Sequence, residues 1–326
     1  EPKRAQAFAY RGRTFMQQQN YARAIEDFNQ ALRLKPDQFD LHTQRGLALY
    51  RQENFDRAIQ DFDQAVELLS QTGDGDASQQ ALIFKYRAQA YARRNETEKA
   101  LSDFDQAAML VLQGIEPDEK SKEIGPISPA LEAQAAEIFS QRGMLHATQG
   151  NTLQAIDDFN RAIKLNSRDV QALYQRGLAH LQQQDVAQAI ADFNEAIVID
   201  PDSADAFYQR GLAYAEQENY RYALEDYNQA LLLRPGNADI VFQKAQVFAK
   251  LGQYIEAVES LNLVLRLNPA EAAALYQRGY AYFQQDDHSQ ALQDFNQVLA
   301  LELDDQIRVQ CLHHRGLIFS RRGEYA

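Results

Sequence analysis

The amino-acid sequence predicts an all-α protein, a right-handed α-solenoid of eight full helix-turn-helix repeats and a partial ninth. Apolar residues recur at helical spacing within a repeat, as Leu173, Leu178 and Leu181 do. Because one helix pair cannot bury its own apolar face, neighbouring pairs must stack. A small residue follows Arg or Lys in every repeat, and five of its eight spacings equal 34 residues. These small residues are Gly12, Gly46, Ala88, Gly143, Gly177, Gly211, Ala245, Gly279 and Gly316.

The repeats are expected to form a single solenoid over residues 1–326 and to begin near residues 5, 39, 81, 136, 170, 204, 238, 272 and 309. Inserts near 73–80 and 115–135 lengthen two of the spacings to 42 and 55 residues. The first insert, within "QTGDGDASQQ", is polar and glycine-rich, which predicts an extended exposed loop. The second insert holds prolines and charges, which predict an irregular start, whereas "PALEAQAAEIF" is expected to begin the next helix early.

Other positions recur in register with the small residue. An alanine follows it by twelve residues in the first eight repeats, and a large apolar residue, mostly Phe, lies four residues further on. This pattern resembles the tetratricopeptide repeat, a 34-residue helix-turn-helix unit, over nearly the whole chain. The resemblance implies a superhelix in which the first helix of each repeat lines a concave groove. The alanines are Ala24, Ala58, Ala100, Ala155, Ala189, Ala223, Ala257 and Ala291.

Residues that tolerate a left-handed backbone stand between the two expected helices of most repeats. Asn and Gly are the residue types that most readily end a helix in this way. We therefore expect left-handed helix ends at Asn20, Asn54, Asn95, Gly150, Asn219, Gly252 and Gly323.

An arginine precedes the small residue in eight of nine repeats, and an aspartate follows it by sixteen residues in seven of eight full repeats. The exceptions, Lys244 and Ser260, fall in the same repeat, which indicates that the two positions touch. The pattern predicts a structural ladder of Arg–Asp pairs, of which Arg176 with Asp192 and Arg210 with Asp226 are examples. An arginine rail for anionic ligands is the alternative, but the matching acids would neutralise it.

The resemblance places the fifth and ninth residues of each repeat on the concave groove. The later repeats carry large or aromatic residues there, and these predict a site for a peptide segment of a partner. The alternative is that these side chains pack against neighbouring first helices. The predicted groove residues are Tyr174, Tyr208, Phe242, Tyr276, Tyr280, Leu178, Leu212 and His313. The front groove offers basic side chains that suit acidic residues of a partner, namely Arg13, Arg51, Lys85 and Arg93.

Charge and composition restrict the class of partner. The net charge of -13 and the pI near 5.0 argue against nucleic acid and anionic membranes. No apolar run approaches the length of a membrane span. The single cysteine, Cys311, forbids an intrachain disulfide and leaves bacterial periplasm and cytoplasm equally open. The asparagine with which some tetratricopeptide repeats grip a C-terminal carboxylate is absent from its position in every repeat.

No phosphate loop, nucleophile elbow or other catalytic constellation occurs, so we expect a protein that is not an enzyme and that has no resident cofactor. A manganese ion is the one cofactor to consider. Mixed Asp and His side chains suit such an ion. The candidate ligands are Asp286, Asp287, His288, His313 and His314.

Three functions remain open on the sequence. The first is a protein-binding scaffold or assembly factor. The second is a metal-carrying photosystem II assembly factor of the cyanobacterial periplasm, because repeat number and charge resemble the processing-associated, PratA-like tetratricopeptide repeat proteins. The third is a self-assembling structural protein, because the ninth repeat stops after its first helix and leaves Leu317 and Ile318 in need of cover. The oligomeric state is left undetermined.

Overall fold

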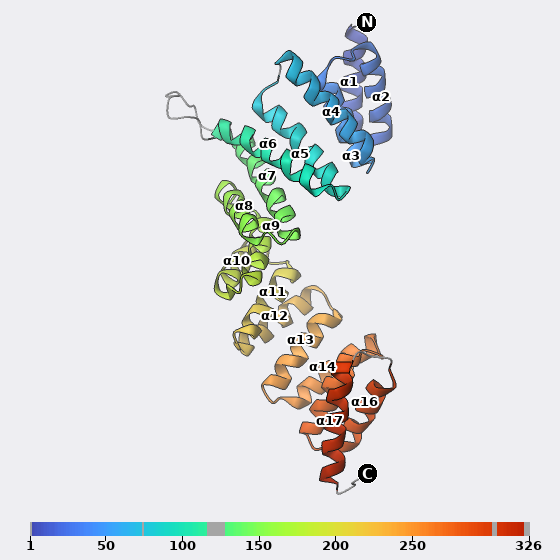
Figure 1. Ribbon diagram of the computed structural model, residues 1–326, viewed down its shortest axis with the longest axis vertical. Coiled ribbons are helices and arrows are strands. Elements are labelled where there is room, and N and C mark those ends of the chain that lie inside the picture. Colours follow the sequence, from blue (N-terminus) through green and yellow to red (C-terminus); the bar gives the residue numbers. More distant parts are fainter. Residues whose placement is uncertain (1, 74, 116–127, 302–304, 323–326) are drawn as a thin grey trace. The chain divides into compact units, whose positions relative to one another are not determined.

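The computed structural model describes residues 2–73, 75–115, 128–301 and 305–322, and over these ranges it holds seventeen α-helices (Figure 1). The prediction of an all-α chain of helix-turn-helix repeats is confirmed. The chain divides into two compact units, Glu1–Ala179 and His180–Ala326. The boundary between the units falls within one helix, α9 (Val170–Gln182).

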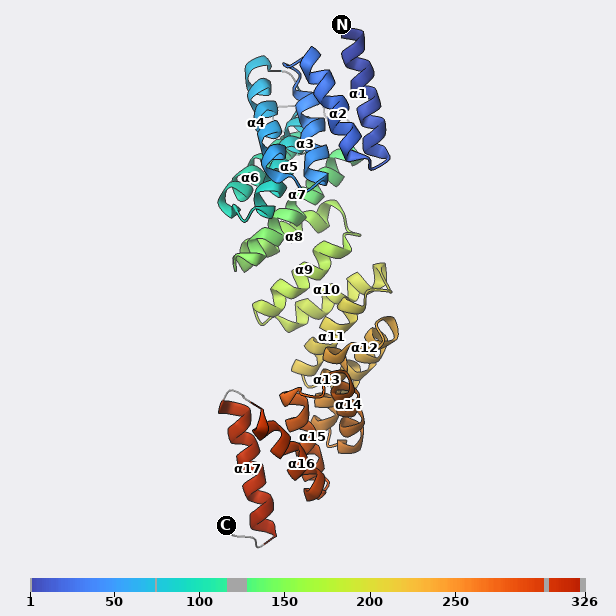
Figure 2. The same cartoon turned by 90° about the vertical axis from the view of Figure 1, so that its right-hand side faces the viewer.

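Unit 1 contains eight complete helices and most of a ninth. They are α1 (Pro2–Gln17), α2 (Tyr21–Leu34), α3 (Phe39–Arg51), α4 (Phe55–Thr72), α5 (Ala77–Arg93), α6 (Thr97–Ile115), α7 (Pro129–Thr148), α8 (Thr152–Leu165) and α9 (Val170–Gln182). From α1 to α8, each first helix contacts its own second helix, as α1 contacts α2, and each second helix contacts the next first helix, as α2 contacts α3. Figure 2 shows this stacking for α1 to α6.

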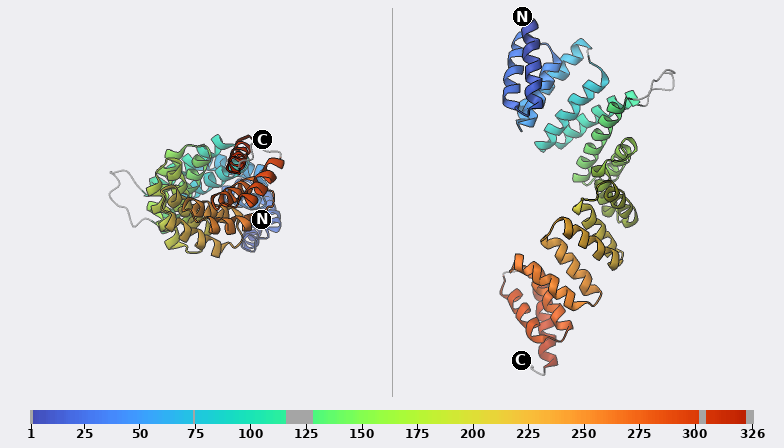
Figure 3. Two further views of the ribbon diagram at one scale, coloured as in Figure 1. Left: turned by 90° about the horizontal axis from the view of Figure 1, so that it is seen from below. Right: turned by 180° about the vertical axis from the view of Figure 1, so that it is seen from behind.

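Unit 2 repeats the same arrangement. Its helices are α10 (Val186–Ile199), α11 (Ala204–Glu216), α12 (Tyr220–Leu233), α13 (Ala238–Lys250), α14 (Tyr254–Leu267), α15 (Ala272–Gln284), α16 (His288–Ala300) and α17 (Asp305–Arg321). The last helix, α17, contacts both α15 and α16, and the red end of the chain in Figure 3 shows it beside them. None of the helices in the described ranges combines the length and apolar composition needed to cross a bilayer.

The recurring glycine and aromatic ring explain how the two helices of a repeat approach closely. A Cβ atom added to Gly46 would lie 2.7 Å from the ring of Phe62, which is completely buried. The same contact recurs in unit 2, where a Cβ on Gly211 would meet the ring of Tyr227 at 2.7 Å. In these repeats the absence of a Cβ atom therefore leaves the space that the ring occupies.

The turn inside each repeat differs in part from the expectation. Asn95, Gly150 and Gly252 do adopt positive φ, but at Asn20 and Asn54 the left-handed residue is the one before. The two asparagines instead cap the following helix, where the side chain of Asn20 accepts a hydrogen bond from Arg23 N. Asn is favoured at both kinds of position, so residue type alone does not distinguish them. Asn219 also holds the N-cap position, although its side chain makes no capping hydrogen bond, and Gly323 lies outside the described residues.

The first insert is shorter as a loop than expected. Helix α4 extends to Thr72, and α5 already begins at Ala77. A capping box starts α5, because the Asp76 side chain accepts from Gln79 N while the Gln79 side chain accepts from Asp76 N. Much of the polar insert therefore lengthens helices. Most of the second insert, residues 116–127, lies outside the described residues, and α7 begins at Pro129.

Candidate functional site

A pocket in unit 2 collects aromatic and amide side chains from three first helices, α13, α15 and α17. It has a volume of about 620 Å³. We call it the aromatic–amide pocket and define it by Phe242, Gln246, Tyr276, Gln277, Tyr280 and Gln310. Three of these six, Phe242, Tyr276 and Tyr280, are predicted groove residues, and the structure brings them together.

The aromatic side chains of this pocket differ in how firmly they are held. The ring of Tyr276 packs against the buried Phe295, with centroids 6.1 Å apart, and against His314 at 5.9 Å. Burial raises the pKa of the Tyr276 hydroxyl, so the group is neutral at neutral pH. Tyr280 lies beside His314 at 5.3 Å, and its hydroxyl accepts a hydrogen bond from Gln284. Tyr276 therefore packs against the core and also lines the pocket, whereas the contacts of Tyr280 are with His314 and Gln284.

The other predicted groove residues are half-buried or exposed. In unit 2, the Tyr208 ring lies 6.2 Å from that of the buried Tyr227, burial raises the pKa of Tyr208, and Leu212 packs on the same core cluster. In unit 1, Tyr174 and Leu178 are half-buried on α9. The packing of Tyr208 and Tyr276 gives weight to the alternative that fifth-position aromatics support the stacking of helices. Their role in binding stays a prediction.

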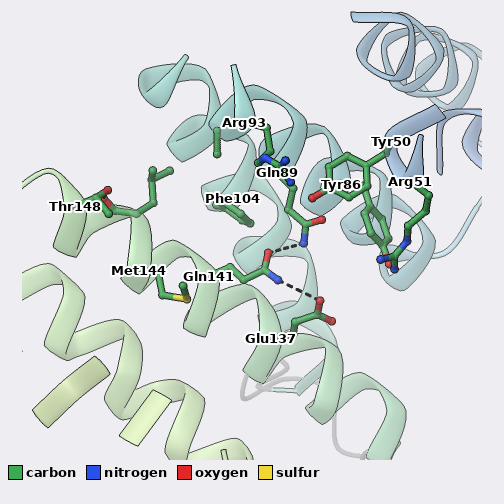
Figure 4. A pocket seen from close by; sticks show the side chains of 12 residues that line it. Tyr50, Arg51, Tyr86, Gln89, Arg93, Phe104, Glu137, Gln141, Met144 and Thr148 are labelled. Atoms are coloured by element: carbon green, nitrogen blue, oxygen red, sulfur yellow. Dashed lines mark hydrogen bonds between the residues drawn. The ribbon is translucent and has the colours of Figure 1, made fainter. Parts of the chain in front are cut away.

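A second pocket lies in unit 1, where α3, α5 and α7 face it (Figure 4). Its volume is about 480 Å³. We call it the tyrosine–arginine pocket and define it by Tyr50, Arg51, Tyr86, Arg93, Gln141 and Met144. Of these residues, Arg51 and Arg93 were named from the sequence, and Met144 holds the ninth position that the resemblance places on the groove.

The predicted basic front groove is wrong at Lys85, and Arg13 has a partner within the chain. Arg13 forms an ion pair with Asp40, and both side chains are about half exposed. Lys85 is only 3% exposed, and its Nζ lies 2.8 Å from Glu137 Oε2 and 4.5 Å from the centre of the Tyr86 ring. A buried ammonium requires a nearby counter-charge, which explains the pairing. Lys85 is therefore not available to a partner in the way the sequence indicated, whereas the ion pair of Arg13 is exposed and its role in binding stays a prediction.

The arginine and the aspartate sixteen residues later are in direct contact in at least six repeats. Arg210 Nε donates to Asp226 Oδ2 at 2.8 Å, and its Nη1 donates to Asn194 of the preceding repeat at 2.5 Å. One guanidinium thus joins both helices of its own repeat and the second helix of the repeat before. Arg176 Nη1 donates to Asn160 Oδ1 at 2.7 Å. Asp192 Oδ2 lies 3.9 Å from His180 Nε2. The six pairs are Arg11–Asp27, Arg45–Asp61, Arg87–Asp103, Arg142–Asp158, Arg210–Asp226 and Arg278–Asp294.

The candidate metal ligands fall into two places. Asp287 caps α16 by accepting from Gln290 N, and Asp286 lies 3.6 Å from Arg321. On α17, His314 Nδ1 lies 2.9 Å from Gln310 O, and the exposed His313 ring is 5.3 Å from that of His314. Over the described ranges, no three His, Cys, Asp or Glu side chains form a group suited to a metal ion. Manganese binding therefore stays an untested prediction.

The sequence alone assigned no role to the residue that directly precedes the motif arginine in each repeat. We call these residues, one per repeat, the pre-arginine column. Gln277 and Gln141 occupy this column and line the two pockets, and Tyr86 stands in the same column of the third repeat. The signal was present, because glutamine recurs there as Gln44, Gln141, Gln175, Gln209, Gln243 and Gln277. Helical spacing alone did not reveal that this column faces the groove together with the fifth and ninth positions.

The fold and its grooved first-helix face define a helical-repeat protein. Protein-family models described as tetratricopeptide repeat match residues 10–76, 140–204, 177–240 and 272–305. A further family model, described as TPR repeat, matches residues 245–286. The chain belongs to the tetratricopeptide repeat family. No curated protein matches it.

Several solved structures share the fold. The C-terminal part of a TPR repeat-containing protein from Cytophaga hutchinsonii is 18% identical with a TM-score of 0.55, covering 93% of this chain and 98% of that one. YrrB, described as a TPR protein with an unusual peptide-binding site, is 22% identical with a TM-score of 0.51, covering 67% and 97%. MamA from Desulfovibrio magneticus is 21% identical with a TM-score of 0.50, covering 51% and 94%. None of these matches is a PratA-like protein, so that resemblance has no support beyond the repeat itself.

Proposed function

We propose that this chain is a protein-binding scaffold, or an assembly factor, that holds an extended segment of a partner protein in the aromatic–amide pocket. The observation that supports this proposal is the aromatic–amide pocket itself, with a volume of about 620 Å³. In it, three aromatic side chains lie beside three glutamines, namely Phe242, Tyr276, Tyr280, Gln246, Gln277 and Gln310. Its size is in the range of sites that enclose small ligands or a few side chains. The peptide-binding site named for the structural neighbour YrrB is consistent with this use.

The chemistry of the pocket fits a peptide better than a charged small molecule. Each glutamine amide both donates and accepts, which matches the N–H and C=O groups of an extended backbone. The tyrosines and Phe242 offer apolar area to side chains at low entropic cost, and each tyrosine keeps a polar tip. Lys250 is the one charged residue among the described lining side chains. Backbone hydrogen bonds with aromatic contact are therefore the expected basis of affinity.

A displayed library of random dodecapeptides, selected on the full chain, tests the proposal. Peptides enriched on the wild type are synthesised, and their affinities are measured for Tyr280→Ala and Gln277→Ala. We expect Tyr280→Ala to weaken binding ~tenfold or more, because a tyrosine at the centre of an interface is often a hot spot. Tyr280 is a better probe than Tyr276, whose ring also packs against Phe295.

Matched controls exist on the second helix α12. Tyr222 is 54% exposed and Gln229 is exposed, and neither lines the pocket. Tyr222→Ala and Gln229→Ala should bind the selected peptides as the wild type does, and all four variants should retain the helical circular dichroism spectrum. The proposal fails if no peptide is enriched over an unrelated helical protein, or if the pocket variants bind as tightly as the controls.

A further inference from the structure

We propose that the tyrosine–arginine pocket of unit 1 binds an acidic segment of a partner protein, in which two carboxylates two residues apart are followed by a large apolar side chain. This pocket is separate from the aromatic–amide pocket that carries the proposed function. The inference can therefore fail while that function stands, and the experiment below distinguishes the two.

The rim of this pocket is cationic in a chain whose net charge is -13. Arg51 is exposed and forms no ion pair with any residue in the described ranges. Arg93 lies over the ring of Phe55 at 4.9 Å, and its 3.4 Å contact with Glu53 joins two side chains that are both more than half exposed. Such an exposed pair contributes little, so Arg93 can exchange Glu53 for a carboxylate of a partner.

The one acidic side chain among the described residues of the lining does not cancel these arginines. Glu137 Oε2 lies 2.8 Å from the buried Lys85 Nζ, and Glu137 Oε1 accepts from Gln141. Figure 4 shows Gln141 linked in turn to Gln89, so a chain of hydrogen bonds joins α5 to α7 across the pocket. Glu137 is thus compensated from within the fold, and the charge left for a ligand is that of Arg51 and Arg93.

Two tyrosines make the wall beside the arginines. The rings of Tyr50 and Tyr86 contact edge to face, with centroids 5.9 Å apart. Burial raises the pKa of Tyr50, although the nearby Arg93 and Arg51 act in the opposite direction. A neutral Tyr50 hydroxyl can donate a hydrogen bond to a carboxylate held by the arginines. The wall therefore adds directional polar contact and apolar area to the cationic rim.

The placement of the arginines sets the spacing of the ligand. Arg51 ends α3 and Arg93 ends α5, and these first helices are in contact. Axes of packed helices lie about 8–10 Å apart. An extended peptide advances about 3.3 Å per residue and shows alternate side chains on one face, so carboxylates two residues apart match this separation within side-chain reach. Met144 lies across the pocket from Arg51, where an apolar side chain further along the peptide would meet it (Figure 4).

The test uses the full chain and the fluorescein-labelled peptide GDADAFG with a blocked, uncharged C-terminus, so that no terminal carboxylate contributes. Fluorescence anisotropy measures its affinity at low ionic strength, beside GNANAFG, which lacks the carboxylates, and GDADAAG, which lacks the apolar side chain. The variants are Arg51→Gln and Arg93→Gln. Arg57→Gln is the matched control, because Arg57 is exposed on α4 and makes the same change in net charge.

We expect GDADAFG to bind more tightly than both control peptides, and its affinity to fall as salt is added. Arg51→Gln and Arg93→Gln should each weaken binding by up to about fivefold, the double variant should weaken it further, and Arg57→Gln should not. Tyr280→Ala in unit 2 should leave this affinity unchanged. Equal binding of GNANAFG, wild-type affinity in the double variant, or an equal loss in Arg57→Gln would each overturn the proposal.

Discussion

The seventh repeat (α13 and α14) and the eighth repeat (α15 and α16) join their two helices through different side chains. In the eighth, Arg278 on α15 donates twice to Asp294, and a third time to Asn262 on α14 at 2.6 Å. In the seventh, Lys244 on α13 keeps only the contact with the preceding repeat, at 2.8 Å from Asn228 Oδ1. Ser260 stands where the aspartate would be and donates to Glu256 O of its own helix at 2.9 Å.

The difference extends to the contact between the two helices. In the eighth repeat Gly279 faces the buried ring of Phe295, and in the seventh Ala245 and Leu261 hold the same two positions, both buried. The seventh repeat thus differs from the eighth at both residues of the ion pair and at both residues of the glycine–ring contact. This fits a general rule, because removing one partner of a buried charged pair is costly whereas replacing both can be nearly neutral. The ion pair is one of two workable ways to join the helices.

The largest expected effect comes from Arg278→Ala. Asp294 has a side chain only 3% exposed and would remain as an uncompensated buried carboxylate. We expect the free energy of unfolding to fall by about 3 kcal/mol in chemical denaturation followed by circular dichroism. Lys244→Ala is the matched control and should cost less than ~1 kcal/mol, since it removes a single contact. Equal losses would show that the two repeats do not differ in this way.

Gly279→Ala is expected to come next. Its Cβ would lie 2.8 Å from the Phe295 ring, so the helices or the ring must shift, at a cost of about 1–3 kcal/mol. Ala88 accompanies the buried Phe104 in the third repeat, which shows that such a shift is possible there. Gly316→Ala is the control, because its Cβ meets nothing within 4 Å, and helix propensity should then favour alanine. Stabilisation by Gly279→Ala would contradict the steric account.

Converting the eighth repeat into the seventh should cost less than breaking it. Asp294→Ser alone leaves the Arg278 guanidinium, which is only 20% exposed, without its carboxylate. The double variant Arg278→Lys with Asp294→Ser should lose about 1 kcal/mol, and less than Asp294→Ser alone, because lysine can keep the Asn262 contact as Lys244 keeps Asn228. A double-mutant cycle measures this coupling, and simple additivity of the single losses would count against it.

The smallest expected effect is an acid dependence in the second repeat. Burial opposes ionisation of Asp61, but hydrogen bonds from Arg45 and His42 outweigh it and lower the Asp61 pKa below its usual value. The stabilisation from this lowered pKa is fully present above about pH 4 and is lost as pH falls through the folded pKa. Asp61→Asn should therefore flatten the decline of the unfolding free energy below about pH 4. Asp37→Asn removes an exposed carboxyl instead and should keep the wild-type slope.

The two pockets show how far the sequence predicted the candidate site. Phe242, Tyr276 and Tyr280 were expected in the groove and do meet in one pocket, because they occupy the same positions of stacked repeats. Gln246 holds the ninth position of its repeat and was also placed on the groove, whereas Gln310 on α17 was not expected. The sequence did not show whether such a ring packs in the core or contacts a partner. Tyr276 both packs against Phe295 and lines the pocket.

The sequence by itself determined the features that are formed by residues of one and the same repeat. Helical periodicity, the glycine facing a ring and the Arg–Asp contact at a separation of sixteen residues all recur in register, so a single chain displays the rule many times. Only the tertiary structure decided which groove charges have a partner within the chain. Arg13 meets Asp40 at a separation of 27 residues, and Lys85 meets Glu137 at 52, beyond an insert. Such pairs do not recur with the repeat, because they depend on how different repeats stack and on the lengths of the segments between them.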